Sequence, residues 1–432
     1  MTINRIAGRT LPLLLLCGLI EARPAGAPAS DSLGIEQAVA IALEHQPAMR
    51  QSSANREAAQ AGLTIARSNY FPQITGTATL THTDGAFVFS PTVTPTNQRY
   101  NTYTTGIAAT QTVLDFGKMV SKVIAGSQLV DAAAYDDYAT RLSVIMNARV
   151  SYYGLMQAVQ VVSADQEAVD KAEEHLKQTR AFYSVGTRAQ FDVTKAEVDL
   201  ANANVALIKA KNGAKIAQLQ LEDAMGIQSA SPILVTSSFP ADSFALSLDS
   251  VRAFARQHRP ELLAAAARVE ANKSLVTAAW AQHMPNLVAS GAYNWTNFNL
   301  PLLSRWNIGL TLTFPIFQGF ATQAGVDQAR AGEEGAQATY DLLQESIMLE
   351  VEQYYLNLRA AQEEIAATDK LVEEAEQSLT LAEKQYAAGV GGLIEVTDAR
   401  QSLADAHITR IQSLYDYSTA LVRLHLAMGD LK

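Results

Sequence analysis

The sequence predicts a mainly α-helical chain that is internally duplicated, with four β-strands and long coiled-coil helices. Three observations predict this fold class. The 432-residue chain matches itself at a nearly constant shift, two long segments without proline repeat apolar residues every seven positions, and four short segments alternate apolar with small polar side chains. Together they indicate one unit of helices and paired strands that occurs twice.

The first 27 residues have the pattern of a secretory signal. Arg5 and Arg9 precede the apolar run Leu11 to Ile20, and either Ala25-Gly-Ala27 or Ala27-Pro-Ala29 offers a small-residue cleavage site. A membrane anchor is the alternative, but a run of about ten apolar residues is shorter than the roughly 20 that a bilayer-spanning helix needs. We therefore predict a signal peptide over residues 1–27.

The predicted mature chain is acidic and has no thiol. Without Arg5, Arg9, Arg23 and Glu21, 30 basic and 42 acidic residues remain, a formal charge of −12, which argues against a nucleic-acid partner. The single cysteine, Cys17, lies inside the predicted signal after a leucine, whereas a lipid-attachment site would have a small residue there. Because removal of the signal peptide also removes this cysteine, the mature chain can form no disulfide and no cysteine metal site.

Self-comparison predicts the domain organisation. Leu33 to Ala78 matches Leu246 to Gly291 at a shift of 213, and Tyr183-x-x-Gly186 matches Tyr386-x-x-Gly389 at a shift of 203. We predict a first repeat over residues 33–226, a linker over 227–245 and a second repeat over 246–429. Each repeat should contain a short helix, two strands, a very long helix, a tight turn and a second helix.

Period-two alternation predicts the four strands. Apolar or glycine residues alternate with small polar ones from Ile74 to Thr81, from Leu287 to Trp295 and from Trp306 to Phe314, and less regularly from Tyr103 to Val113. Asp84 to Asn101, rich in Thr, Pro and Asn, is predicted to be an exposed loop. Strands of about ten residues suit a membrane β-barrel, but closure takes about eight strands or more. Strands in lipid would therefore need several chains; a soluble sandwich is the alternative.

Period seven predicts the long helices. Leu155, Val162, Val169 and Leu176 are spaced by seven in the first repeat, and the second repeat has an equivalent series from Val351 to Tyr386. A helix from about Lys118 to Val185 would be on the order of 100 Å long at about 1.5 Å per residue. Such a helix is long enough to cross a periplasm.

In this order, these features resemble the TolC-type outer membrane efflux protein family, the outer membrane factors, over essentially the whole mature chain. The resemblance rests on paired features: the Xaa-Pro helix breaks at Pro47 and Pro260, the strand entries Phe71-Pro72 and Met284-Pro285, and the turns Tyr183 to Thr187 and Tyr386 to Val390. It implies a homotrimer with a 12-stranded β-barrel in the outer membrane and a 12-helix α-barrel in the periplasm.

The resemblance also implies a function. The chain would be the outer membrane channel subunit of a tripartite efflux pump or type I secretion system, a passive export duct from the periplasm to the exterior. Its partners would be a periplasmic membrane-fusion adaptor, an inner-membrane pump of the RND, ABC or MFS type, and outer membrane lipid. The alternative is a periplasmic or surface coiled-coil scaffold or adhesin without a conducting lumen.

Two carboxylates are implied to line the pore. The family's tunnel-lining acidic pair falls on Glu395 and Asp398, whose spacing of three positions places them on one face of a helix. Three copies would form two carboxylate rings that attract cations. An acidic first helical turn, favoured by the helix dipole, is the alternative role for both residues.

The gate contacts are implied in the same way. The family's closing contacts fall on Tyr386 and, in the other repeat, Asp192. The family's arginine falls on Gly391, whereas Arg188 lies in the other repeat. We therefore include Arg188 among the predicted gate residues.

No catalytic constellation is found in the sequence. Asp115-Phe-Gly117 occurs without a glycine-rich phosphate loop or a His-Arg-Asp segment, and the seven histidines show neither an HExxH pattern nor metal-ligand pairing. We therefore expect no enzyme activity, no metal and no cofactor.

Overall fold

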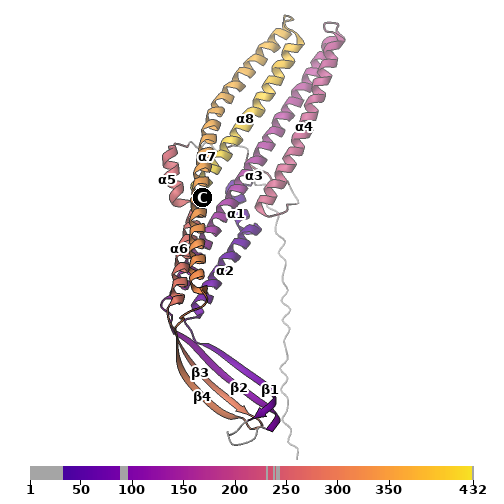
Figure 1. The fold of residues 1–432 in the computed structure, drawn as a ribbon. Helices are drawn as coiled ribbons and strands as arrows, with labels where there is room; N and C mark the ends of the chain where they lie inside the picture. Colours follow the sequence, from indigo (N-terminus) through magenta and orange to yellow (C-terminus); the bar gives the residue numbers. More distant parts are fainter. Residues whose placement is uncertain (1–32, 88–95, 230–231, 237–238, 240–243, 431–432) are drawn as a thin grey trace, which may run out of the picture.

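The structure is a computed structural model that describes residues 33–87, 96–229, 232–236, 239 and 244–430. The predicted signal peptide, with Arg5, Arg9 and Cys17, lies outside the described residues. Figure 1 shows an elongated molecule with a β-sheet at one end, two helical hairpins at the other, and short helices around the middle. Among the described helices, none is long and apolar enough to cross a membrane.

Both halves of the chain have the same order of elements. The first half contains α1 (Ile35–His45), α2 (Pro47–Ser68), β1 (Gln73–Phe87), β2 (Thr96–Leu114), α3 (Lys118–Ser184) and α4 (Gln190–Met225). The second contains α5 (Leu248–His258), α6 (Pro260–Trp280), the 3-10 turn η1 (Ala281–His283), β3 (Asn286–Asn297), β4 (Leu303–Thr313), α7 (Ala321–Ala387) and α8 (Leu393–Met428). Helices α3 and α7 have 67 residues each, and α4 and α8 have 36 each. These equal lengths support the proposed duplication.

Each Xaa-Pro break between short helices packs against the end of a hairpin. Nε2 of Gln46 donates hydrogen bonds to the carbonyl oxygens of Asp223 (2.9 Å) and Ala224 (3.1 Å) at the end of α4. At the equivalent break, Nη1 of Arg259 donates to the carbonyl oxygen of Leu426 (3.2 Å) near the end of α8. Proline has no backbone N–H, and in the first turn of a helix that N–H would have no partner within the helix. The proline that begins α2 or α6 therefore starts the new helix without the loss of a hydrogen bond.

The four strands form one antiparallel sheet in the order β1-β2-β3-β4. The central pair joins the two halves of the chain, with Thr105 opposite Trp295. Trp306, Ile308 and Leu310 on β4 are 71%, 80% and 71% exposed, so this strand presents an apolar face to its surroundings. Within the described residues, β1 and β4 each pair with one strand only, which leaves both sheet edges open.

The first hairpin of the sheet is longer than predicted. Asp84–Phe87 belongs to β1 and Thr96–Asn101 to β2, so the prediction of a loop over Asp84 to Asn101 is wrong for these flanks. Cross-strand pairs explain the difference: Nε of Arg99 lies 2.9 Å from a carboxylate oxygen of Asp84, and His82 hydrogen-bonds to Asn101 at 2.8 Å. Polar composition indicated a loop, but facing polar side chains also stabilise strands.

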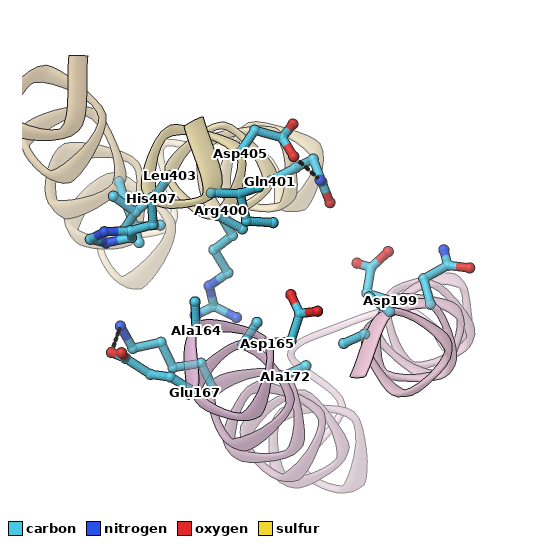
Figure 2. Close-up of a pocket in the computed structure, with 18 of the residues that line it drawn as sticks. Ala164, Asp165, Glu167, Ala172, Asp199, Arg400, Gln401, Leu403, Asp405 and His407 are labelled. Carbon is cyan, nitrogen blue, oxygen red and sulfur yellow. Dashed lines mark hydrogen bonds and ion pairs between the residues drawn. The ribbon is translucent and has the colours of Figure 1, made fainter. Parts of the chain in front are cut away.

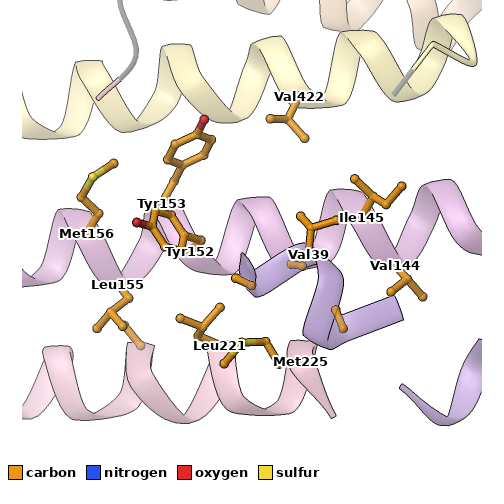
Figure 3. Packing of buried hydrophobic residues seen from close by; sticks show 14 of the residues in the cluster. Val39, Val144, Ile145, Tyr152, Tyr153, Leu155, Met156, Leu221, Met225 and Val422 are labelled. Atoms are coloured by element: carbon orange, nitrogen blue, oxygen red, sulfur yellow. The ribbon is translucent and has the colours of Figure 1, made fainter. Parts of the chain in front are cut away.

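The largest apolar core lies at the middle of the molecule, where the short helices meet the hairpins. Figure 3 shows Tyr152, Leu155 and Met156 of α3 packed with Leu221 and Met225 of α4 and with residues of α1. Part of the predicted linker joins this core, because Leu33 forms a parallel bridge with Val235 and its carbonyl oxygen accepts a hydrogen bond from the Tyr152 hydroxyl (2.8 Å). The core thereby fixes the bases of the hairpins and leaves their tips to be held by other contacts.

Candidate functional site: the joint between the two hairpins

The hairpins α3–α4 and α7–α8 run side by side (Figure 1). They enclose a cleft of about 710 Å³, shown from close by in Figure 2. All four helices line it. Small side chains form much of its wall, namely Ala164, Ala168, Ala172, Ala203, Ala206 and Ala404. Since alanines project little from a helix, they leave space in the cleft for the side chains of a packing partner.

Charges of both signs face the cleft. Glu167 is paired with Lys171 at 2.6 Å, and this hydrogen bond and charge lower the pKa of Glu167. Arg400 reaches from α8 toward α3 and donates to Glu383 at 2.8 Å (Figure 2). Asp165 is only 8% exposed, and burial raises its pKa. Asp165 is therefore the carboxylate of the cleft that would gain most from a cationic partner.

Near the tips, the turn between α3 and α4 contacts α7. Nη2 of Arg188 donates a hydrogen bond to the carbonyl oxygen of Tyr386 at 2.9 Å, and its guanidinium carbon lies 4.0 Å from the centroid of the Tyr386 ring. A cation over an aromatic face is stabilised by about 0.5–1 kcal/mol, and by more where water is excluded. Tyr386 is only 7% exposed. The structure thus brings together two predicted gate residues that are 198 positions apart.

Two further polar side chains of α3 lie next to Tyr386. The His175 ring centroid is 6.1 Å from that of Tyr386, and Thr179 is fully buried. The hydroxyls of Thr179 and Tyr386 lie close to each other but do not reach hydrogen-bond geometry. We call the contact made by Arg188, Tyr386, His175 and Thr179 the hairpin joint.

The electrostatics of the hairpin joint keep its residues in defined protonation states. Burial lowers the pKa of His175 to about 4, and the charge of Arg400 acts in the same direction, so the imidazole is neutral at pH 7. Burial raises the pKa of Tyr386, with a smaller contribution in the same direction from Asp192, while Arg188 opposes it. Asp192 itself is half-buried in the first turn of α4.

The predicted pore carboxylates both lie at the start of α8. Glu395 and Asp398 are exposed in the single chain. The Glu395 Oε2 accepts a hydrogen bond from the backbone N–H of Gly392 at 3.1 Å, so this residue caps the helix, as the alternative role anticipated. A pore role for the two carboxylates remains a prediction.

Gly391 occupies the position where the family resemblance places an arginine. A Cβ there would lie 3.0 Å from Cβ of Gln385 and 3.2 Å from Oε2 of Glu395, so a side chain at this position would crowd the turn. Arg188, from the other hairpin, supplies the guanidinium that contacts Tyr386 instead.

Polar contacts also join the hairpins below the joint. The hydroxyl of Thr397 on α8 donates to Asp199 on α4 at 3.1 Å, and Asp199 also pairs with Lys195 at 2.8 Å. Nearer the middle, Gln157 of α3 donates to Gln412 of α8 at 2.5 Å. The hairpins of one chain are thus held together by hydrogen bonds along much of their length.

Sequence reasoning missed His175, Thr179, Asp199 and Thr397. One signal was present, because positions 158, 165, 172 and 179 of α3 recur every seven residues and hold Ala158, Asp165, Ala172 and Thr179, a small-residue series that contains two polar members. A polar residue in such a series faces a helix partner and needs an explanation. In the part of the chain that the structure describes, no group of three His, Cys, Asp or Glu residues could hold a metal ion.

Known proteins share this architecture. The TolC outer membrane protein of Vibrio cholerae is 25% identical over 404 residues, covering 90% of this chain and 89% of its own. The CyaE protein of Bordetella pertussis is 25% identical over 415 residues, covering 94% and 86%. Among solved structures, the CmeC outer membrane channel of Campylobacter jejuni superimposes with a TM-score of 0.82 at 20% identity, over 92% of this chain and 85% of that one.

A second solved structure agrees with the first. The outer membrane protein VceC of Vibrio cholerae superimposes with a TM-score of 0.80 at 20% identity, over 91% of this chain and 96% of that one. The family model described as "Outer membrane efflux protein" matches residues 38–227 and 253–430, and therefore both halves of the chain. The chain belongs to the outer membrane efflux protein family.

Proposed function

We propose that this chain is one subunit of a homotrimeric duct that carries cargo passively across the outer membrane, as the exit channel of a tripartite efflux pump or type I secretion system. One observation carries the proposal: a four-stranded sheet open at both edges continues into two helical hairpins whose long helices are on the order of 100 Å. A soluble sheet would cover its edges, whereas a shared barrel uses them.

The open edges support a barrel shared by several subunits, and the number three comes from the family resemblance. A backbone N–H or carbonyl left unpaired in hydrocarbon costs several kcal/mol, so β1 and β4 need partners in the membrane. Pairing β4 of one subunit with β1 of the next around a threefold axis gives a closed barrel of 12 strands. The hairpins of three subunits would then enclose a periplasmic tunnel.

The partners follow from the tunnel. We propose that a periplasmic membrane-fusion adaptor packs helices into the cleft, whose alanine wall has room for them, and that an inner-membrane pump of the RND, ABC or MFS type supplies the energy. The subunit itself would conduct cargo without catalysis or a cofactor. The acidic net charge of the chain argues against a nucleic-acid partner.

The hairpin joint is the proposed gate. While Arg188 holds Tyr386, the tips of the two hairpins stay together; separation of the tips would widen the tunnel. Asp192 contributes its charge at the joint, and Glu395 and Asp398 would form carboxylate rings that favour cations.

The test is single-channel conductance of the detergent-purified mature protein in a planar bilayer, with chemical cross-linking to count subunits. A trimer with a small, cation-selective conductance is expected. Glu395→Ala combined with Asp398→Ala should weaken the cation preference, with Asp405→Ala on the same helix as the control. Release by osmotic shock without detergent, together with no conductance, would favour the scaffold alternative instead.

A further inference from the structure

Tyr386, which Arg188 contacts, also lies beside two buried polar side chains of α3. His175 is 6%, Thr179 0% and Tyr386 7% exposed. Within the described residues, His175 Nε2, Thr179 Oγ1 and Tyr386 Oη have no hydrogen-bond partner. Buried polar atoms without partners destabilise a fold, so three of them in one contact call for a functional reason.

We propose that His175 and Thr179 are positioning residues for the contact between Arg188 and Tyr386, and that the hairpins stay joined only while the His175 imidazole is uncharged. The inference rests on the proposed function in one respect, namely that separation of the hairpins opens the duct. The packing gives the mechanism: His175 and Thr179 hold Tyr386 from α3 while Arg188 holds it from the turn.

Burial and the charge of Arg400 disfavour a charged His175 more than the three nearby carboxylates favour one. The charge of Arg400 acts on His175 from α8, and Arg188 lies over the ring of the neighbouring Tyr386. Of the nearby carboxylates, Asp199 of α4 is already paired with Lys195, and Glu383 of α7 with Arg400. The third carboxylate, Asp192 of α4, raises the pKa of His175 least of the three.

Protonation would therefore favour separation of the hairpins. The pKa of His175 is lowered to about 4 in the joined state, and exposure to water would return it toward its ordinary value of about 6.5. Because the separated state binds the proton more tightly, a fall in pH favours separation, starting below about 6.5 and complete near 4. From pH 7 to 4.5 the ratio of separated to joined hairpins should rise roughly 50-fold per subunit.

The separation can be measured without relying on conductance. The predicted mature chain has no cysteine, so spin labels can be placed specifically at Gln178→Cys on α3 and Lys384→Cys on α7, both exposed. Labelled subunits diluted with unlabelled ones report the distance between hairpins of one chain by double electron–electron resonance. We expect this distance to lengthen between pH 7 and 4.5.

Variants assign the effect to His175. His175→Gln should abolish the change above pH 4.5, leaving only what the carboxylates contribute when they protonate near or below that pH. His175→Arg should lengthen the distance already at pH 7. His283→Gln is the matched control, because His283 lies in η1 beside the sheet, outside both the cleft and the joint, and it should behave as the unsubstituted chain.

Thr179→Val gives an independent check if His175 variants fold poorly. A merely structural residue would lose an unpaired buried hydroxyl, which is neutral or stabilising; a positioning residue would release Tyr386 and lengthen the distance at pH 7. An unchanged distance in the unsubstituted chain, or a full pH response in His175→Gln, overturns the proposal. A pH-dependent distance without any conductance would instead reject the proposed duct and keep the switch.

Discussion

The two halves of the chain share a backbone plan but differ in the side chains that hold it. Where Gln46 ties the first helix break to α4 with neutral hydrogen bonds, Arg259 at the second is buried between Glu261 (2.8 Å) and Glu350 (3.1 Å). In the first hairpin Arg180 pairs with Glu197, and at the equivalent positions of the second Glu383 pairs with Arg400, with the charges reversed.

The tips differ most. Tyr183 at the end of α3 is 46% exposed, whereas its equivalent Tyr386 is 7% exposed, because Arg188 covers Tyr386 and the equivalent Gly391 has no side chain to cover Tyr183. Apolar spacing, glycine and proline therefore produce equal backbones, while charged side chains make the two hairpins unequal partners. The contact between Arg188 and Tyr386 therefore occurs at the tip of the second hairpin and has no equivalent at Tyr183.

The largest loss of stability should come from replacing the glycine that ends each half of the chain. Gly429 has a φ of +76°, and a Cβ there would lie 2.6 Å from the carbonyl oxygen of His258; at Gly226 the closest atoms of the first break are 3.0 Å away. Gly429→Ala should lower the free energy of unfolding by about 3 kcal/mol, and Gly226→Ala by about 1.5 kcal/mol. Denaturant titration of the detergent-solubilised protein by circular dichroism measures both. Equal losses would contradict the tighter packing at the second break.

A smaller loss of stability is expected from removing the charge of Arg259 at the second helix break. Arg259→Gln installs the first-half residue but leaves the half-buried Glu350 without its partner. Breaking a buried ion pair costs about 3–5 kcal/mol of stability. Because the side chains of Glu261 and Glu350 are partly exposed to solvent, we expect the free energy of unfolding to fall by about 2 kcal/mol. Adding Glu350→Asn, which copies Asn147 of the first half, should recover about half of the loss in the same titration. No recovery would show that Arg259 acts by packing alone.

The smallest change in stability, about 1 kcal/mol, is expected from Arg188→Ala, which removes the cation over Tyr386. A change of about 1 kcal/mol corresponds to a roughly fivefold change in an equilibrium constant, so the substitution should raise the open probability in a planar bilayer by about that factor. Arg180→Ala is the matched control, since its pair with Glu197 is 59% and 46% exposed and contributes little. If both variants opened the channel equally, the tips would not depend on the hairpin joint.

Much of the fold could be predicted because its signals are local. The absence of proline and the seven-residue spacing predicted a helix from Lys118 to Val185, and α3 spans Lys118–Ser184. Alternation predicted the strands, although cross-strand pairing extended the first two beyond the expected ends. The family resemblance pointed to Tyr386 and Arg188 separately.

The hairpin joint itself could not be predicted from the sequence. A heptad pattern sets which face of a helix is buried but not how far one hairpin slides along another, and that offset decides whether Arg188 meets Tyr386. The burial of His175 depends on the same offset, so its lowered pKa appears only once the hairpins are placed. Polar residues within the small-residue series, such as Thr179, were the one local indication.

The most direct test of the account locks the hairpins together. Asp199 and Thr397 are in contact at 3.1 Å across α4 and α8, so Asp199→Cys with Thr397→Cys can be bridged by a short, reducible bis-methanethiosulfonate linker. We predict that the linked trimer stays at its small conductance down to pH 4.5 and that reduction restores opening, while each single-cysteine variant is unaffected by the linker. A linked trimer that opens as freely as the reduced one would contradict a gate formed by separation of the hairpins.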